Sequence, residues 1–328
     1  MGRGEGLSYV LPLRTGADEP VEELGAYLGW LVGEVTDVVV VDGSDPEVLE
    51  AHRRAFPAEV VLVPPDERTP MGKVGGVMTG LRRAACDEVV VADDDVRYDA
   101  DALGRMKELL GRADVVRPAN HFDPLPWHAR LDTARILFNR ALGGDWPGTL
   151  GVRRGLVLAA GGYDGGAMFE NLELVRTVQA MGGTELVASD VHIRRLPPTT
   201  AHFVGQRVRG AYDEFARPAR LATWLAVGPG VAVLAARRRW VTLAVGAAAI
   251  AATAELGRRR DGGRRVFPAS SSLLAPAWVA ERSVSSWLAV GSRLRGGVRY
   301  RDGRLRKAAS SPRELRRRFA ERRPPRIG

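Results

Sequence analysis

Residues 88–101 read EVVVADDDVRYDAD, and this stretch decides the fold. Its first part, Val89–Val91, is a short run of β-branched apolar residues, which is typical of a strand buried on both faces of a parallel sheet. Three carboxylates, Asp93, Asp94 and Asp95, follow at the point where this strand should end. Like charges this close repel one another, so we expect a cation to neutralise them. Oxygen ligands in this arrangement suit Mg²⁺ or Mn²⁺, which in turn bind phosphate groups.

Acidic residues also favour the first turn of a helix, and a helix should begin near Ala100. This alternative accounts for Asp99 or Asp101, but not for three acids placed directly at a strand end. The acid triplet (residues 93–95) therefore predicts a metal and phosphate site.

Strand and helix patterns alternate through the N-terminal third of the chain. The expected strands are Leu7–Leu13, Val38–Val41, Glu59–Val63 and residues 88–92, and the expected helices are Val21–Val32, Val74–Ala85 and Ala102–Gly111. Such alternation produces a mostly parallel sheet with helices on both faces, so the predicted fold class is α/β. Ligands of these sheets bind at the carboxyl ends of the strands. Asp42, Lys73 and the acid triplet all fall at that edge, which points to one shared site.

The chain of 328 residues carries 48 lysines and arginines against 39 aspartates and glutamates, a formal net charge of +9. This excess predicts an acidic partner such as a nucleotide or anionic lipid. Nucleic acid is not expected, because the basic runs have no base-stacking platform or recognised nucleic-acid-binding fold beside them. The single cysteine, Cys86, excludes an internal disulfide and a cysteine-rich zinc module. The first residues, MGRGEGLSYVLPLR, lack the long apolar core of a signal peptide, so we expect a cytoplasmic catalytic part.

Two apolar stretches, Leu221–Ala236 and Trp240–Leu256, follow a first domain at residues 1–218. Each has roughly sixteen residues, against about 17–25 for a spanning helix, and Arg237–Arg239 separates them. Three interpretations are open: a spanning pair, a re-entrant or shallow hairpin, and a helix pair in a soluble core. A spanning pair would place the three arginines on the side opposite the catalytic part, against the positive-inside tendency. We expect a hydrophobic helical hairpin at residues 219–257.

Residues 258–328 are crowded with arginine. Within them, Leu273–Leu294 mixes tryptophan and leucine with charged residues, as an amphipathic helix at a membrane interface would. The arginine-rich end, RELRRRFAERRPPR, would either lie on anionic lipid or form a disordered solubilising tail. The sequence thus predicts a basic tail with an interfacial helix that contacts an anionic membrane surface.

Six short motifs follow one another along residues 7–215. They are VVVVDGSD around Asp42, GKVGGVMTGL with Lys73, VADDDV with the acid triplet, GGYD at residues 161–164, FENLEL with Glu170, and QRVRG at residues 206–210. In order and spacing they resemble the family 2 glycosyltransferases of the GT-A fold, particularly membrane-associated, ceramide glucosyltransferase-like members. The resemblance implies a GT-A sheet followed by membrane-associated helices.

The resemblance also implies a nucleotide site around the acid triplet. By that comparison Asp42 contacts the base or ribose, Asp93 and Asp94 lie on the nucleotide side, and Asp95 ligates the Mn²⁺ or Mg²⁺ that bridges the diphosphate. Lys73 would offset phosphate charge as a point cation. On the residues alone, Lys73 is equally well explained as a solvated lysine at a helix start.

The chain departs from the family at the expected catalytic base. Family members have Glu-Asp where this chain has Glu170-Asn171, and asparagine cannot accept the proton of an acceptor hydroxyl. Glu170 or Glu173 could substitute, because residues three apart on a helix share a face. Both glutamates could instead balance the dipole of the helix start.

A second departure lies in the family's Gln-x-x-Arg-Trp motif. Gln206 and Arg209 are present, but Gly210 stands in the place of the tryptophan. The resemblance implies that Gln206 lies beside the nucleotide and that Arg209 holds the leaving diphosphate. Because the aromatic residue is missing, we expect transfer of a single sugar rather than processive polymer synthesis.

Together these features predict an inverting, metal-dependent hexosyltransferase with a UDP-sugar as the expected donor. Its acceptor would be a lipid or lipid-linked molecule at the cytoplasmic face of the cell membrane, bound by Ala119–His128 and Gly161–Asn171. Two alternatives stay open. A nucleotidyltransferase would need a glycine-rich phosphate loop after the first strand, where LPLRTGADEP is poor in glycine. A non-catalytic, membrane-bound nucleotide-sugar binder would explain Asn171 as a lost base.

Overall fold

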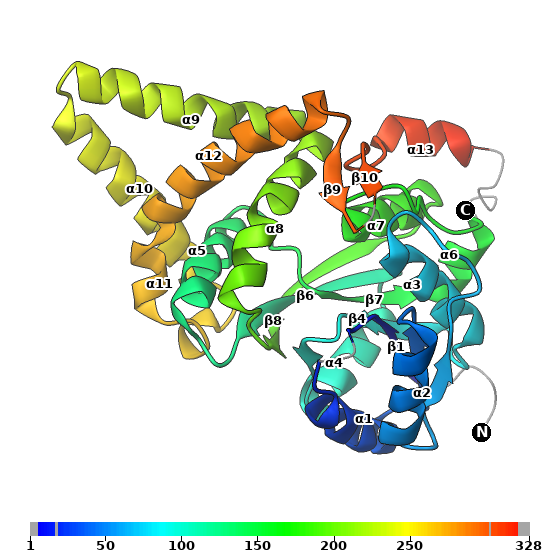
Figure 1. Cartoon of the computed structure of the whole chain (residues 1–328). Coiled ribbons are helices and arrows are strands. Elements are labelled where there is room, and N and C mark those ends of the chain that lie inside the picture. Colours follow the sequence, from blue (N-terminus) through cyan, green and yellow to red (C-terminus); the bar gives the residue numbers. More distant parts are fainter. Residues whose placement is uncertain (1–5, 17–18, 302, 321–328) are drawn as a thin grey trace, which may run out of the picture.

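The computed structural model describes residues 6–16, 19–301 and 303–320, and it is built around one eight-stranded sheet (Figure 1). In spatial order the strands are β3 (Val61–Val63), β2 (Asp37–Asp42), β1 (Ser8–Leu13), β4 (Glu88–Ala92), β7 (Thr149–Arg153), β6 (Val115–Phe122), β8 (Glu185–Arg195) and β5 (Val96–Arg97). The first four are parallel, and β6 and β8 are parallel to each other. Strand β7 runs antiparallel to both of its neighbours, and β5 runs antiparallel to β8. The predicted α/β class with a mostly parallel sheet is confirmed.

Helices cover both faces of the sheet, as expected. On one face α1 (Glu22–Glu34) and α4 (Ala100–Leu110) share a core with alternate strand residues such as Tyr9, Val40 and Val90. On the other face α3 (Gly72–Arg83) and α7 (Glu170–Ala180) pack on the intervening residues, among them Val10 and Val91. Both sides of β1, β2 and β4 are therefore buried, which explains why these strands are continuous apolar runs.

The remaining helices border the carboxyl ends of the strands or follow the sheet in the chain. They are α2 (Pro46–Ala55), α5 (Trp127–Ala141), α6 (Arg154–Ala159), α8 (Thr200–Tyr212) and α11 (Ala269–Leu273). The helix-cap reading of the acids is correct for Asp99, whose side chain accepts a hydrogen bond of 2.8 Å from the amide of Ala102 at the start of α4. It does not extend to the acid triplet, which lies in the turn between β4 and β5.

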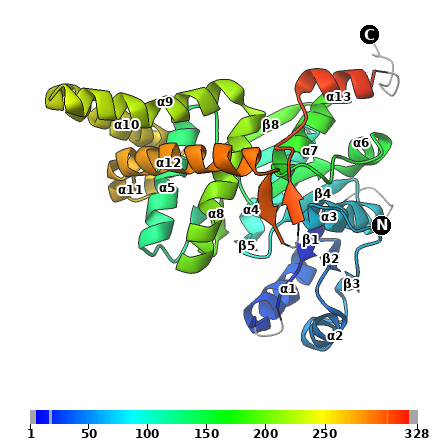
Figure 2. The same cartoon turned by 45° about the horizontal axis from the view of Figure 1, so that its top comes forward.

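Two apolar helices, α9 (Pro218–Ala236) and α10 (Trp240–Arg259), project from the body as a hairpin with Arg237–Arg239 at its tip (Figures 1 and 2). Both are long and apolar enough to cross a membrane, and only 11% of each apolar window is buried. That exposure argues against the interpretation of a helix pair in a soluble core. The base of α10 is held tightly on α5, because a Cβ atom at Gly257 would lie 1.9 Å from the carbonyl oxygen of Leu137.

The segment after the hairpin returns to the sheet. Helix α12 (Ala275–Leu294) is amphipathic and exposes Trp287, Leu288 and other apolar residues along one side. It leads to a small hairpin of β9 (Val298–Tyr300) and β10 (Gly303–Leu305), which packs on the core next to α3. The domain boundaries at residues 218 and 257 stay a prediction.

The arginine-rich end, expected to lie on lipid or to be disordered, is folded as far as it is described. Helix α13 (Pro312–Arg318) begins with a capping box formed by Ser311 and Glu314. Leu315 and Phe319 are buried against the end of α7. The arginines of α13 therefore lie on a helix that Leu315 and Phe319 anchor to the rest of the protein. Residues 321–328 lie outside the described part.

Candidate active site

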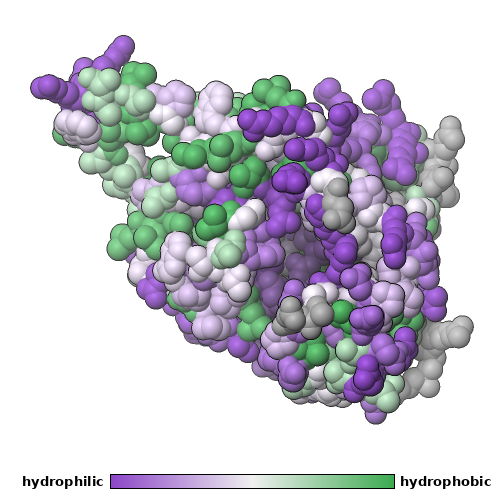
Figure 3. Space-filling view, viewed as in Figure 1, coloured by the Kyte–Doolittle hydropathy of each residue, from purple (hydrophilic) through white to green (hydrophobic). Residues whose placement is uncertain are grey.

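Two cavities lie at the carboxyl edge of the parallel strands, where the sequence placed the site. The first cavity, about 480 Å³, is bordered by Asp93 and Asp95 and by α5, α7, α8 and α12. The second cavity, about 620 Å³, lies between the ends of β1 and β2, the start of α3 and the β9–β10 hairpin. Lys73 lines both cavities. In the space-filling view the surface is hollowed near its centre, between hydrophilic side chains (Figure 3).

Lys73, in the first turn of α3, connects two carboxylates from distant parts of the chain. Its Nζ atom lies 2.6 Å from Oδ1 of Asp93 and 2.7 Å from Oε1 of Glu170. Burial alone would lower the pKa of Lys73, but the two carboxylates hold it well above its usual value. The lysine is therefore charged at neutral pH. The interpretation of Lys73 as a solvated helix-start residue does not fit this geometry.

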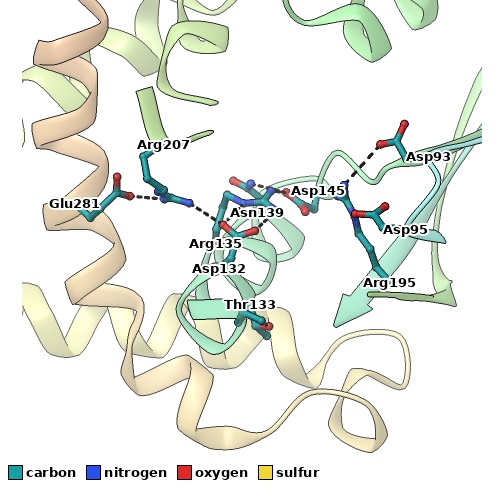
Figure 4. Close-up of polar contacts among 11 residues, drawn as sticks. Asp93, Asp95, Asp132, Thr133, Arg135, Asn139, Asp145, Arg195, Arg207 and Glu281 are labelled. Carbon is teal, nitrogen blue, oxygen red and sulfur yellow. Dashed lines mark hydrogen bonds and ion pairs between the residues drawn. The ribbon is translucent and has the colours of Figure 1, made fainter. Parts of the chain in front are cut away.

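The acid triplet is divided between the two cavities. Asp93 and Asp95 line the first cavity, whereas Asp94 lines the second. The guanidinium of Arg195, at the end of β8, reaches the first pair: its Nε lies 2.8 Å from Asp95 Oδ2 and its Nη2 lies 3.6 Å from Asp93 Oδ2 (Figure 4). The side chain of Asp94 still reaches solvent, yet the surrounding protein and then the other two carboxylates raise its pKa to about 6. Arg195 is a site residue that the sequence alone did not indicate.

The first turn of α7 separates the two candidate bases. Glu170 faces the first cavity and pairs with Lys73. Asn171 lines the same cavity, and its side-chain amide donates a hydrogen bond of 3.0 Å to the carbonyl of Pro147. Glu173 is completely buried elsewhere, where its two oxygens accept hydrogen bonds of 2.5 and 2.6 Å from the amide and hydroxyl of Ser310. The structure thus brings Glu170 to the cavity and does not bring Glu173 there.

Helix α8 carries the QRVRG motif along the first cavity. Gln206 is exposed at the cavity rim, where its side chain contacts His202 one turn earlier. Arg209 is half-buried, and Gly210 follows it on the wall. One turn beyond Arg209, Asp213 lines the same cavity, and its Oδ1 is buried without a hydrogen-bond partner.

Asp213 was not predicted, although its position one helical turn after the arginine of a recognised motif was a signal. Burial, followed by the nearby charge of Glu170, raises the pKa of Asp213 well above its usual range. Burial thus favours the neutral form of Asp213 over the charged one. A carboxyl group of this kind can donate a proton or a hydrogen bond inside the cavity.

Asp42 ends β2 on the wall of the second cavity. Its Oδ2 lies 2.6 Å from Nδ1 of His52, and its Oδ1 accepts a hydrogen bond of 2.8 Å from the amide of Ser44. Opposite this wall, the β9–β10 hairpin contributes Tyr300 and Arg301 to the lining. The C-terminal segment therefore closes the second cavity, an arrangement that sequence patterns did not indicate because the segment resembles a basic tail.

We compared the chain with known protein families, sequences and solved structures. No protein-family model and no curated protein sequence matches the chain. Among solved structures, it is similar to the mannosyltransferase PcManGT from Pyrobaculum calidifontis in complex with GDP-Man and Mn²⁺, with 19% identity, 86% of each chain covered and a TM-score of 0.55. It is also similar to glucosyl-3-phosphoglycerate synthase from Mycobacterium tuberculosis, with 17% identity over 64% of this chain and 78% of that chain and a TM-score of 0.41.

This chain has the GT-A fold. Identities this low establish the fold alone, so the expected place in family 2, near the ceramide glucosyltransferases, stays a prediction. Within the GT-A fold, the two cavities occupy the edge at which α/β sheets bind their ligands.

A divalent metal can be tested against the carboxylates of this GT-A site. Asp95 Oδ1 is buried and has no hydrogen-bond partner among the described residues, and burial raises the pKa of Asp95. In the described part of the chain, no three His, Cys, Asp or Glu side chains gather as a closed ligand set. Magnesium-type sites commonly use one or two carboxylates and complete their shell with substrate phosphates and water. Asp95, with Asp93 beside it, fits an open site of that type.

Proposed function

We propose that the protein is a metal-dependent glycosyltransferase that moves one sugar from a nucleotide-sugar, with a UDP-sugar as the expected donor, to a lipid or lipid-linked acceptor with inversion. The observation that carries the proposal is the bridge from Asp93 through Lys73 to Glu170. It joins a triplet of acids suited to a nucleotide diphosphate with a carboxylate suited to deprotonate an acceptor. This bridge stands where the two cavities meet, so donor and acceptor groups would be brought together there.

The donor nucleotide would occupy the second cavity. Asp42 would contact its base or ribose, held in position by His52 and the amide of Ser44. Lys73 would offset charge on the diphosphate, and Asp94 would lie on the nucleotide side of the acid triplet. Asp93 and Asp95 would hold Mn²⁺ or Mg²⁺, which neutralises developing charge on the leaving diphosphate when it is bound.

The acceptor would enter the first cavity. Glu170 would take the proton of its hydroxyl as the hydroxyl oxygen attacks the sugar carbon from the side opposite the diphosphate. Lys73 would hold Glu170 in position through their ion pair before the acceptor arrives. Arg209 and Gln206, from the rim formed by α8, would hold the departing nucleotide.

Exposed apolar helices support an acceptor that lies in a membrane. The α9–α10 hairpin is apolar and largely exposed, with apolar side chains on the side seen in Figure 3, and Trp287 and Leu288 on α12 add to the exposed apolar residues. A third, basic cavity beside α8 and α12 is lined by Arg209, Arg295, Arg299, Arg301 and Arg304. Anionic headgroups would be attracted to such a cluster, which fits a protein at the cytoplasmic face of the cell membrane.

The test is nucleotide release from UDP-, GDP- and dTDP-sugars, with Mn²⁺ or Mg²⁺ and membrane lipids present. We expect metal-dependent release from one donor by the wild type, and loss of that release in Asp95→Ala and Glu170→Gln. Arg264→Gln, a surface change remote from both cavities, serves as the matched control. Absence of both turnover and metal-dependent binding for every donor would refute the proposal.

A non-catalytic nucleotide-sugar binder is the second candidate, and Asn171 is the observation that favours it. In the usual motif an aspartate stands there, whereas the Asn171 amide is used to hold the carbonyl of Pro147. Asn171→Asp separates the two candidates. A binder that lost its base would gain turnover in this variant, whereas an enzyme that uses Glu170 would be unchanged or slower.

A further inference from the structure

Arg282, in the middle of α12, is a buried cation that forms no ion pair with any residue in the described part of the chain. Its side chain lines the first cavity, only 4% of the residue is exposed, and its buried Nε and Nη1 atoms have no hydrogen-bond partner among the described residues. The guanidinium lies 5.8 Å from the ring centroid of Trp278, one turn earlier. Burial, with the charge of Arg207 added, lowers the pKa of Arg282 to about 10, so it still carries its proton at neutral pH. Buried charges are normally paired, because an unpaired one is costly to desolvate.

The carboxylates around Arg282 are engaged by other residues. Arg207 contacts Glu281 and lies 3.0 Å from Asp132 (Figure 4), and Ser285 also donates to Glu281. Glu214 lies 3.2 Å from both Arg217 and Arg220. The charges of Glu281 and Glu214 act on Arg282, yet among the described residues no acid, Asp213 included, lies within ion-pair distance of its guanidinium. The buried Nε atoms of Arg207 and Arg217 also lack hydrogen-bond partners within the same part of the chain.

Gly210 leaves the space in front of this guanidinium open. A Cβ atom at Gly210 would stand 3.8 Å from both Nη atoms of Arg282, which is ordinary van der Waals contact. A longer side chain from the same position would extend over the donors and cover them. The glycine that replaces the tryptophan of the related motif therefore gives a ligand access to Arg282.

The site lies between the reaction centre and the apolar helices. Asp213 is influenced by the charge of Glu170 and also by that of Arg282, so these three residues surround one part of the first cavity. Trp278 and Phe122, which belong to one apolar cluster, also line this cavity. A ligand there would place an anionic group on the arginine and an apolar portion toward α12.

We propose that Arg282, reached past Gly210, binds a phosphate group of the acceptor. This inference rests on the proposed glycosyltransferase function and narrows its acceptor to a molecule that carries a phosphate near the hydroxyl to be glycosylated. A phosphate offers several oxygens to the unpaired donors of Arg282 and to the neighbouring Arg207 and Arg217, and guanidinium groups match that geometry. The phosphate could belong to a lipid or to a small soluble phosphomonoester.

Calorimetric titration in detergent with inorganic phosphate, a short alkyl phosphate and dodecyl phosphate tests the proposal. UDP and Mn²⁺ at high concentration are present, so that the donor side is filled. We expect binding to the wild type and at least tenfold weaker binding to Arg282→Gln and to Gly210→Leu, which keeps the charge but covers it. Arg264→Gln, which removes a positive charge from an exposed position that lines none of the three cavities, should bind like the wild type.

Thermal unfolding without ligand distinguishes a binding residue from a structural one. Arg282→Gln should unfold at the same or a higher temperature than the wild type, because it removes an uncompensated buried charge. The proposal would be overturned if Arg282→Gln bound phosphate as tightly as the wild type. It would also be overturned if Arg282→Gln melted at a much lower temperature and Arg282→Lys restored the melting temperature but not phosphate binding. Tighter binding of dodecyl phosphate than of the short alkyl phosphate identifies a lipid source, and equal binding identifies a soluble one.

Titration with UDP alone keeps the two hypotheses apart. If UDP binds in a metal-dependent way but phosphate binding does not depend on Arg282, the acceptor inference fails and the glycosyltransferase proposal stands. If no nucleotide binds while phosphate binding still depends on Arg282, the anion site is real and the proposed function fails.

Discussion

Glu170 and Glu173 both lie in the first turn of α7, and their substitution by glutamine should have opposite consequences. Glu170→Gln removes the proposed proton acceptor while keeping the size of the side chain. Loss of a general base slows the chemical step by about 10²–10⁴-fold, which equals about 2.7–5.4 kcal/mol of activation free energy. Its effect on stability should be near 1 kcal/mol or less, because Lys73 keeps its second partner, Asp93.

Glu173→Gln should instead destabilise the fold. The carboxylate accepts two hydrogen bonds from Ser310 in a completely buried position. The glutamine can replace only one acceptor, and its NH₂ group would face a donor. A hydrogen bond to a charged group contributes about 1.5–3 kcal/mol, so we expect the free energy of unfolding to fall by about 2–4 kcal/mol, with turnover of the folded fraction retained.

The two variants are compared by single-turnover nucleotide release and by denaturant unfolding, with both measurements on the same preparations. Glu170→Gln should lose turnover and keep its unfolding midpoint, and Glu173→Gln should do the reverse. Full turnover in Glu170→Gln, together with loss of turnover at native stability in Glu173→Gln, would refute the assignment of roles from the structure.

Three further changes test other parts of the molecule. Arg195→Gln frees one oxygen each on Asp93 and Asp95 and removes a positive charge that competes with the metal. Mn²⁺ binding, measured by calorimetry, should therefore become about tenfold tighter. Weaker binding would mean that the arginine orients the carboxylates for the metal. Burial, with the charge of Arg140 nearby, lowers the pKa of His192 to about 4, whereas histidine in the unfolded chain titrates near about 6.5. The neutral His192 therefore stabilises the fold fully above about pH 6.5, and this stabilisation is lost as the pH falls toward about 4. His192→Asn should make the free energy of unfolding less dependent on pH across this window. Val241 and Val245 are 78% and 64% exposed on α10. Their replacement by aspartate should release the protein from liposomes in a flotation assay, since each charge costs about 2.5–3.5 kcal/mol at the centre of a bilayer. UDP binding should persist in this variant.

Much of the nucleotide side could be predicted from sequence because its signals are local. The apolar runs that end at Asp42 and at the acid triplet specify buried strands and mark the edge where they stop. Parallel pairing then brings those ends together without knowledge of any side-chain contact. Lys73 follows from the same logic, since α3 begins at that edge.

The parts that could not be predicted depend on contacts between distant segments. Strand β7 lies in a glycine-rich stretch with little strand character, and it pairs antiparallel at the centre of the sheet. Arg195 meets Asp95 from 100 residues away, and no spacing rule connects them. For Glu170 and Glu173 the helical spacing was ambiguous, because residues three apart on a helix lie close to the same face. In the structure, however, Glu170 faces the first cavity and Glu173 faces the segment that contains Ser310.

The C-terminal segment links the exposed hairpin with both cavities, and this continuity explains why so basic a segment is folded. Helix α12 packs along α9 and presents Arg282 to the first cavity. The β9–β10 hairpin then closes the second cavity with Tyr300 and Arg301, and Ser310 holds Glu173 on the helix that carries Glu170. A displacement of α12 by membrane or acceptor would therefore act on the walls of both cavities and on the anchor of α7. Because the apolar hairpin, the arginine that we propose binds phosphate and one wall of the second cavity belong to one continuous stretch of chain, the proposed donor and acceptor sites are joined by covalent continuity as well as by Lys73.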